Sequence, residues 1–133
     1  MDASSPSQAP PARKNRGFLI YVVPALFWAA LIFIGGGADL NDPEHEVKLP
    51  YDKLQHVVAF AVLTYLGFRA LRHVAPGAAQ RRLIALSAFL SVSVGILLEL
   101  YQLGLPHRSA EVADVIADTA GAAVAAAWLY FRR

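Results

Sequence analysis

The chain has 133 residues, a formal net charge of +2 and no cysteine, and 56% of its residues are hydrophobic. This length favours a single domain, and the lack of cysteine excludes disulfides, thiolate catalysis and cysteine metal sites. The hydrophobic residues form long runs almost free of charge, which a soluble domain of this size does not need. We therefore expect an all-α integral membrane protein.

Residues 1–16 are rich in Pro, Ser and Ala and end in the basic residues Arg13, Lys14 and Arg16. A segment of this composition cannot bury enough apolar surface to fold, so we predict a disordered cytoplasmic tail. The apolar stretch that follows is long for a signal peptide and lacks a convincing cleavage site. We predict that residues 17–133 form one transmembrane domain.

A helix needs about 20 mostly apolar residues to cross the hydrocarbon core of a membrane. Four segments meet this requirement: Phe18 to about Gly36, Asp52 to Leu71, Arg82 to Leu105, and Glu111 to Phe131. The later connections are short, so neighbouring helices should run antiparallel in a four-helix bundle. We interpret Trp28 and Trp128 as anchors in the headgroup layer, which indole rings favour.

The basic residues predict how the helices are oriented. Nine of the twelve Lys and Arg residues lie before the first span, at or between the adjoining ends of the second and third spans, or after the fourth span. Short loops rich in Lys and Arg stay in the cytoplasm, so this side is cytoplasmic. We therefore predict that both termini are in the cytoplasm of a multi-pass protein.

Ionisable and amide side chains gather near the outer ends of the predicted spans. A charged group near the centre of a span costs about 2.5–3.5 kcal/mol, so it persists only near an end, in a pair, or for a function. We therefore predict a functional cluster in one outward-facing layer. Its members are Asp52, Lys53, His56, Glu99, Gln102, Arg108, Asp114 and Asp118.

Asp114 and Asp118 lie four residues apart, so they share one face of the fourth span and repel each other when both are ionised. A nearby cation, a bound metal ion or a shared proton must resolve this repulsion. The candidate cations are Lys53, His56 and Arg108. No metal-binding motif of fixed spacing is present, so the sequence leaves metals and cofactors open.

Small residues repeat at four-residue spacing on the third span, next to Glu99. Ser87, Ser91 and Gly95 form this stripe, and Ala113, Ala117 and Gly121 form a similar one on the fourth span. Small residues let membrane helices approach closely. The polar side chains on these faces are therefore predicted to point into the bundle and away from lipid.

Several short patterns occur in a fixed order. The pattern Asp-Lys-x-x-His-x-x-x-aromatic is formed by Asp52, Lys53, His56 and Phe60. Glu-x-x-Gln follows at Glu99 and Gln102, and then Arg108, Asp114, Asp118 and Gly121. In this order the patterns resemble the VanZ-like family over roughly Tyr51 to Ala127. That family usually has Asn where this chain has Asp118, and often Gly where it has Ala125.

The resemblance implies a small bacterial protein of the inner (plasma) membrane. The namesake of the family is linked to teicoplanin resistance, which makes antibiotic resistance an expectation for this chain, but the family supplies no reaction. Catalytic residues and oligomeric state therefore stay open.

Four functions are compatible with the residues. We favour an outward-facing site that binds or acts on a cell-envelope molecule, either a lipid headgroup or a glycopeptide-related one. Membrane lipids, an anionic envelope lipid or a small molecule are the expected partners, and no nucleic-acid signature is present. The alternatives are a structural or partner-binding subunit, a membrane-embedded metal or acid–base enzyme, and an ion-coupled transporter.

Overall fold

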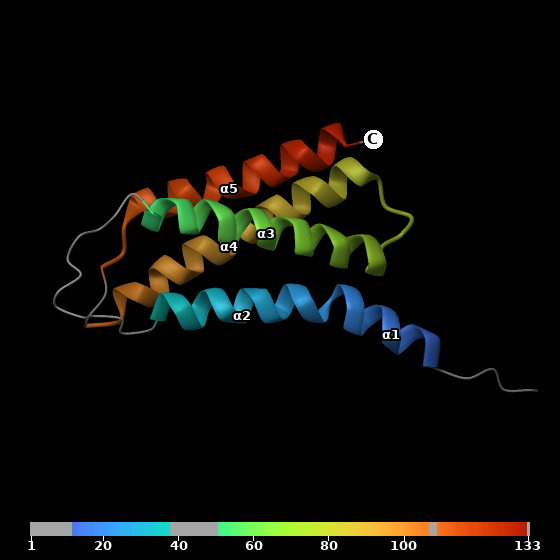
Figure 1. Cartoon of the computed structure of the whole chain (residues 1–133), viewed down its shortest axis with the longest axis horizontal. Helices are drawn as coiled ribbons and strands as arrows, with labels where there is room; N and C mark the ends of the chain where they lie inside the picture. Colours follow the sequence, from blue (N-terminus) through green and yellow to red (C-terminus); the bar gives the residue numbers. More distant parts are fainter. Residues whose placement is uncertain (1–11, 38–50, 107–108, 133) are drawn as a thin grey trace, which may run out of the picture.

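The computed structural model describes residues 12–37, 51–106 and 109–132. Their regular elements are the helices α1 (Ala12–Tyr21), α2 (Val23–Gly37), α3 (Tyr51–Val74), α4 (Gln80–Leu103) and α5 (Val112–Phe131), drawn in Figure 1. Four segments are long and apolar enough to cross a membrane. The first, Arg16–Gly37, consists of the second half of α1 and the whole of α2, and the other three are α3, α4 and α5. The predicted all-α fold with four spans is confirmed, and each span lies within a few residues of its predicted position.

The first span is bent where α1 meets α2. Pro24 has no backbone N–H to donate, and Ala25 N instead donates to Val22 O over 3.1 Å, one residue nearer than in a regular helix. The helix begins at Ala12, so Ala12 to Arg16, which we assigned to the tail, are helical. Residues 1–11 of that predicted tail lie outside the described residues.

Helices α3, α4 and α5 pack against one another and form the core of the bundle. The predicted stripe of small residues on α4, Ser87, Ser91 and Gly95, is buried. On α5, Gly121 is buried so closely against α3 that a Cβ atom there would overlap the carbonyl oxygen of Val57. Of the predicted stripe on α5, Ala117 and Gly121 are buried, whereas Ala113 is exposed. At the buried positions, small residues bring the backbones of these helices close together.

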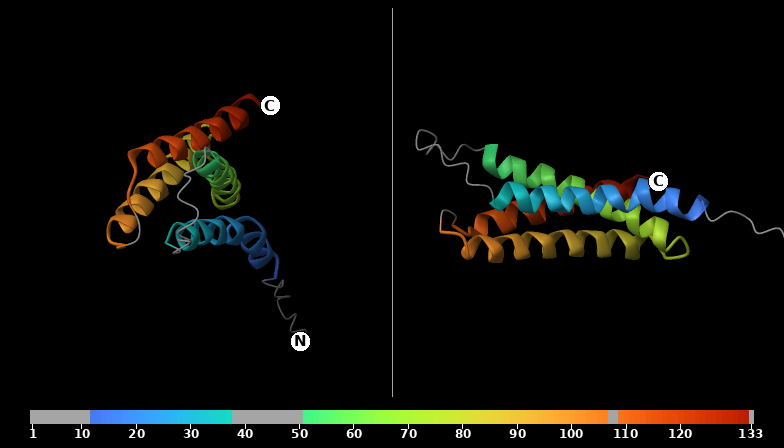
Figure 2. Two further views of the ribbon diagram at one scale, coloured as in Figure 1. Left: turned by 60° about the vertical axis from the view of Figure 1, so that its left-hand side comes forward. Right: turned by 90° about the horizontal axis from the view of Figure 1, so that it is seen from below.

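Helix α2 lies on the outside of this core, against α3 and α4, as the views in Figure 2 show. None of its residues is buried. The indole N–H of Trp28 donates to the carbonyl oxygen of Ala59 over 2.9 Å and so joins α2 to α3. Trp28 thus forms a contact between α2 and α3. Our interpretation of Trp28 as a headgroup anchor did not predict this contact.

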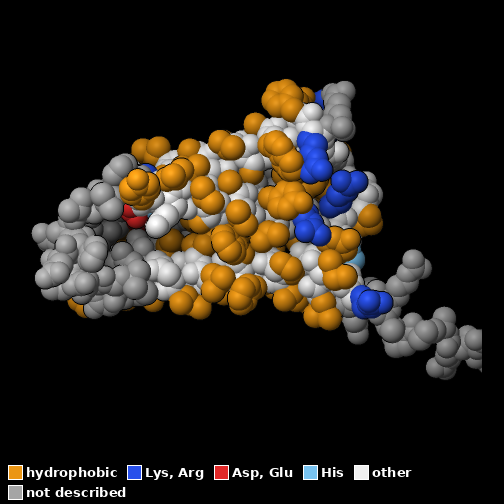
Figure 3. All heavy atoms as spheres, viewed as in Figure 1, with side chains coloured by type: hydrophobic (Ala, Val, Ile, Leu, Met, Phe, Trp, Pro, Cys, Tyr) orange, Lys and Arg blue, Asp and Glu red, His pale blue; other side chains and the backbone are white. Residues whose placement is uncertain are grey.

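The surface of the bundle separates apolar and charged side chains (Figure 3). Large hydrophobic residues are exposed along the helices, including Phe27 on α2, Phe89 on α4 and Val124 on α5. Such a continuous apolar surface suits contact with lipid. Most of the Lys and Arg side chains visible in Figure 3 gather at one end of the helices, and acidic side chains lie at the other.

Candidate functional site

The starts of α3 and α5 lie beside the end of α4, because α4 runs antiparallel to both of them. This arrangement brings together seven of the eight predicted site residues, while Arg108 lies outside the described residues. One further acid, Glu111, joins them directly before α5. We call this group the polar cluster: Asp52, Lys53, His56, Glu99, Gln102, Glu111, Asp114 and Asp118.

Lys53 connects the start of α3 to the start of α5. Its ammonium group contacts Asp114, lies 3.0 Å from Oε2 of Glu111 and lies 3.4 Å from Oδ2 of Asp52. The Lys53 side chain remains 37% exposed, whereas Asp114 is 10% exposed. Three carboxylates therefore share one ammonium group at the rim of the polar cluster.

His56 lies one helical turn further into the bundle than Asp52. Its Nδ1 atom lies 2.8 Å from Oδ1 of Asp118, and its Nε2 atom lies 3.9 Å from Oδ2 of Asp114. The imidazole ring also lies parallel to the ring of Phe60, with the ring centres 6.5 Å apart. His56 thus stands between the two aspartates whose repulsion the sequence predicted.

Asp118 is the most deeply buried carboxylate of the polar cluster, with a relative exposure of 0%. One oxygen faces His56, and the other, Oδ2, lies against Gly95 of α4. A Cβ atom at Gly95 would come within 2.5 Å of Oδ2, so the glycine makes room for the carboxylate. Oδ2 has no hydrogen-bond partner in the part of the chain that the structure describes.

Glu99 reaches from the end of α4 to the start of α5. Its Oε2 atom accepts a hydrogen bond of 2.7 Å from the backbone N–H of Glu111, the residue that precedes the first turn of α5. A carboxylate at the start of a helix is favourable, because unpaired N–H groups point toward it. The other oxygen, Oε1, is buried and has no partner within the described residues.

Gln102 is directed toward a different neighbour from the other predicted residues. Its Nε2 atom donates to the carbonyl oxygen of Gly36 over 3.0 Å and ties the end of α2 to α4. The structure therefore assigns Gln102 a contact between helices at the edge of the polar cluster.

Glu111 is the residue that our prediction missed. We used it only to mark the start of the fourth span, although it precedes Asp114 by three residues and so lies near it on a helix. Its Oε2 atom lies 3.0 Å from Nζ of Lys53, and its backbone N–H donates a hydrogen bond to Oε2 of Glu99. This spacing could have revealed its place in the polar cluster.

The polar cluster carries more negative than positive groups. Among the described residues it holds five carboxylates, one ammonium group and one imidazole. One ligand atom each from Asp52, His56 and Asp114 lies within 4.8 Å of the other two, a spacing at which these side chains could bind a divalent cation. The geometry thus suits a positively charged group more than a negatively charged one.

The VanZ/LLP1 family model matches residues 7–133. This chain belongs to the VanZ/LLP1 family. The match extends the predicted resemblance, which began near Tyr51, across the first span and into the segment before it. A search of curated proteins and a search of solved structures each found no match. Family membership together with four membrane-length helices establishes a membrane protein of the VanZ type.

Proposed function

We propose that this VanZ/LLP1-family protein lies in the inner membrane of a bacterium with both termini in the cytoplasm. The polar cluster would then face outward and bind the headgroup of a cell-envelope molecule. The orientation is supported by arginines at the end of the bundle opposite the polar cluster, among them Arg69, Arg72, Arg81, Arg82 and Arg132. Lys and Arg mark the cytoplasmic side of multi-pass proteins.

One observation carries the proposed binding site. Asp118 and Glu99 each keep a buried carboxylate oxygen without a partner in the described chain, in a cluster that already has an excess of carboxylates. Leaving buried acceptors unsatisfied costs about 1–3 kcal/mol each. A protein that only needed to pack its helices would gain stability from apolar residues there. The arrangement therefore favours a site that is completed by a ligand.

The charge of the polar cluster indicates the chemistry of that ligand. An ammonium group on a lipid or glycopeptide-related molecule would complement the carboxylates directly. An anionic headgroup would need another cation, because Lys53 is already shared by three carboxylates. That cation would be Arg108 or a divalent metal ion held by Asp52, His56 and Asp114.

The experiment is native mass spectrometry of the protein purified in mild detergent, which identifies co-purified envelope molecules. We expect a bound species in the native protein that is lost in Asp114→Asn and Asp118→Asn. The control is Asp2→Asn, which makes the same change in net charge and lies far from the polar cluster in the sequence. Identical bound species in all four proteins would contradict the proposal.

The variant Arg108→Ala separates the two kinds of ligand. If the headgroup is anionic and Arg108 binds it, the species is lost in Arg108→Ala as well. If an ammonium group binds the carboxylates, the species remains. If Arg108→Ala retains the bound species and a chelator removes it, a divalent cation joins the anionic headgroup to the carboxylates.

A metal-dependent enzyme is the second candidate, because Asp52, His56 and Asp114 could supply an imidazole and two carboxylates. It predicts one equivalent of divalent metal in the purified protein and its loss in His56→Ala. Metal analysis of both proteins tests this candidate, and metal-free native protein that is insensitive to added cations would remove it.

A further inference from the structure

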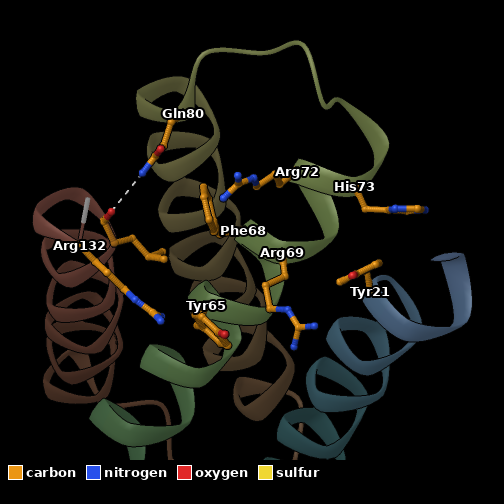
Figure 4. A pocket seen from close by; sticks show the side chains of 9 residues that line it. Tyr21, Tyr65, Phe68, Arg69, Arg72, His73, Gln80 and Arg132 are labelled. Atoms are coloured by element: carbon orange, nitrogen blue, oxygen red, sulfur yellow. Dashed lines mark hydrogen bonds between the residues drawn. The ribbon is translucent and has the colours of Figure 1, made fainter.

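At the end opposite the polar cluster, an open pocket of about 810 Å³ lies among α1, α3, α4 and the end of α5 (Figure 4). Its basic side chains are Arg69, Arg72 and His73 from α3 and Arg132 directly after α5. Figure 4 shows Arg69 lying between Tyr65 and Tyr21, while Arg132 extends from α5 toward Tyr65. Side chains far apart in the sequence thus converge on one concave surface.

The arginines of this pocket have no carboxylate to neutralise them within the described chain. No acidic residue lines the pocket. The acids that the structure describes, Asp52, Glu99, Glu111, Asp114 and Asp118, all belong to the polar cluster at the other end. The pocket is therefore a concentration of positive charge, which a bound anion would balance.

Aromatic rings hold the arginine side chains in place. The Arg69 guanidinium carbon lies 5.1 Å from the centre of the Tyr21 ring and 5.9 Å from that of Tyr65. Tyr21 also stacks on His73 with ring centres 5.1 Å apart, and Arg132 lies 4.7 Å from the Trp128 ring. A guanidinium stacked on a ring keeps the N–H groups at its edge available for the paired oxygens of a phosphate.

The surroundings of the pocket favour a lipid as the source of the anion. The pocket lies at the ends of membrane-length helices, where the headgroup layer begins. Ile20 and Phe131 neighbour the pocket residues Tyr21 and Arg132 in the sequence and are exposed, so acyl chains have an apolar surface beside the charges. A free phosphate ion would make no use of that surface.

We propose that this pocket binds the phosphate group of an anionic phospholipid and holds that lipid between α1, α3 and α5. The guanidinium groups of Arg69, Arg72 and Arg132 contact the phosphate oxygens, while the acyl chains lie along the exposed helices. This lipid site does not depend on the ligand of the polar cluster, and each can be tested without the other.

The test measures lipid affinity by native mass spectrometry and by thermal unfolding in detergent, with phosphatidylglycerol and phosphatidylcholine as probes. We expect phosphatidylglycerol to bind and to raise the melting temperature, and phosphatidylcholine, which has no net charge, to do neither. The double variant Arg69→Gln/Arg72→Gln should bind phosphatidylglycerol about tenfold more weakly or worse, because each basic residue at a membrane surface contributes about a fivefold change in affinity.

The matched control is Arg81→Gln/Arg82→Gln. It removes two arginines at the same end of the bundle, but neither lines the pocket. It should keep most of the affinity for phosphatidylglycerol. Equal losses in the two double variants would show a general attraction to headgroups and overturn the proposal, as would equal binding of both lipids by the native protein.

Two further measurements separate the remaining outcomes. Millimolar inorganic phosphate that displaces phosphatidylglycerol completely would identify a free-anion site and overturn the lipid source. If Arg69→Gln/Arg72→Gln unfolds in the absence of lipid, Arg72→Gln alone replaces it, because the Arg72 side chain is exposed. Unchanged lipid affinity in that single variant would count against the site.

Discussion

At Lys53, one ammonium group meets the carboxylates of Asp52, Glu111 and Asp114. We expect Lys53→Gln to lower the free energy of unfolding by about 1–3 kcal/mol, because three acids lose a shared cation at a partly exposed position. Unfolding in mild detergent with increasing denaturant measures this change. The double variant Lys53→Gln/Asp114→Asn should recover part of the loss, and a double variant less stable than Lys53→Gln would contradict this explanation.

Removing an acid from the same cluster should have the opposite effect. Neutralising a functional site often stabilises a fold, because such sites carry repulsion. We expect Glu99→Gln, Asp114→Asn and Asp118→Asn to raise the melting temperature or leave it unchanged. A sharp fall in all three would show that the carboxylates form a structural ion-pair network, and the structural-subunit alternative would then lead.

Single residues also show how far the sequence could predict this site. Four-residue spacing, together with the free-energy cost of a charge inside a span, predicted that Asp52, His56, Asp114 and Asp118 belong to one cluster. The direction of Gln102 toward Gly36 did not follow, because it depends on where α2 docks. Spacing within one helix carries no information about a partner on another.

Among the elements, α3 and α5 make the closest approach at Gly121. A Cβ atom there would meet backbone, which cannot rotate away as a side chain can. We expect Gly121→Ala to separate the two helices and to lower the free energy of unfolding by about 1–3 kcal/mol, the usual range for overpacking. Chemical unfolding in detergent measures the change.

Gly35→Ala is the matched control for this substitution. An added Cβ at Gly35 would meet nothing within 4 Å, and alanine favours a helix over glycine. The control should therefore be neutral or slightly stabilising. If Gly121→Ala were as stable as Gly35→Ala, the backbone contact between α3 and α5 would not limit how closely these helices pack.

The elements themselves were predictable where composition alone decides them. The spans followed from the lengths of the apolar runs, and the buried faces of α4 and α5 followed from their small residues, except that Ala113 of the predicted α5 stripe is exposed. The basic pocket did not, because Tyr21, Arg69 and Arg132 come from three separate segments. From the sequence, the basic connection from Arg69 to Arg82 indicates the orientation of the helices and a contact with anionic lipids. It does not indicate a pocket, since no short pattern connects these three residues.

For the whole molecule, the orientation in the membrane is the property that the proposed function most depends on. The 133-residue chain has no cysteine, so single introduced cysteines can report the side of each loop without background labelling. Gly77 and Ser109 are exposed and lie in the connections at opposite ends of the bundle. In spheroplasts, we expect a membrane-impermeant thiol reagent to label Ser109→Cys directly and Gly77→Cys only after lysis. The reverse pattern would place the polar cluster in the cytoplasm.

Hydrogen exchange should divide the bundle into two parts. Helices α3, α4 and α5 share the buried core, whereas α2 buries none of its residues. Local opening requires the least free energy where few buried contacts must break. We expect the amides of α2 to exchange before those of the central turns of α3 to α5, as measured by mass spectrometry in detergent. Uniform exchange across the four spans would contradict this expectation.

The external position of α2 also bears on how the protein is made. Helix α2 precedes α3, α4 and α5 in the chain, so during synthesis it enters the bilayer before the surfaces that it will contact exist. None of its residues is fully buried in the bundle, so its apolar side chains already suit lipid before the core exists. The carboxylates of the later helices can be covered only when α3, α4 and α5 meet. During membrane insertion, α2 can therefore stay in contact with lipid while α3, α4 and α5 assemble, and can pack against them last.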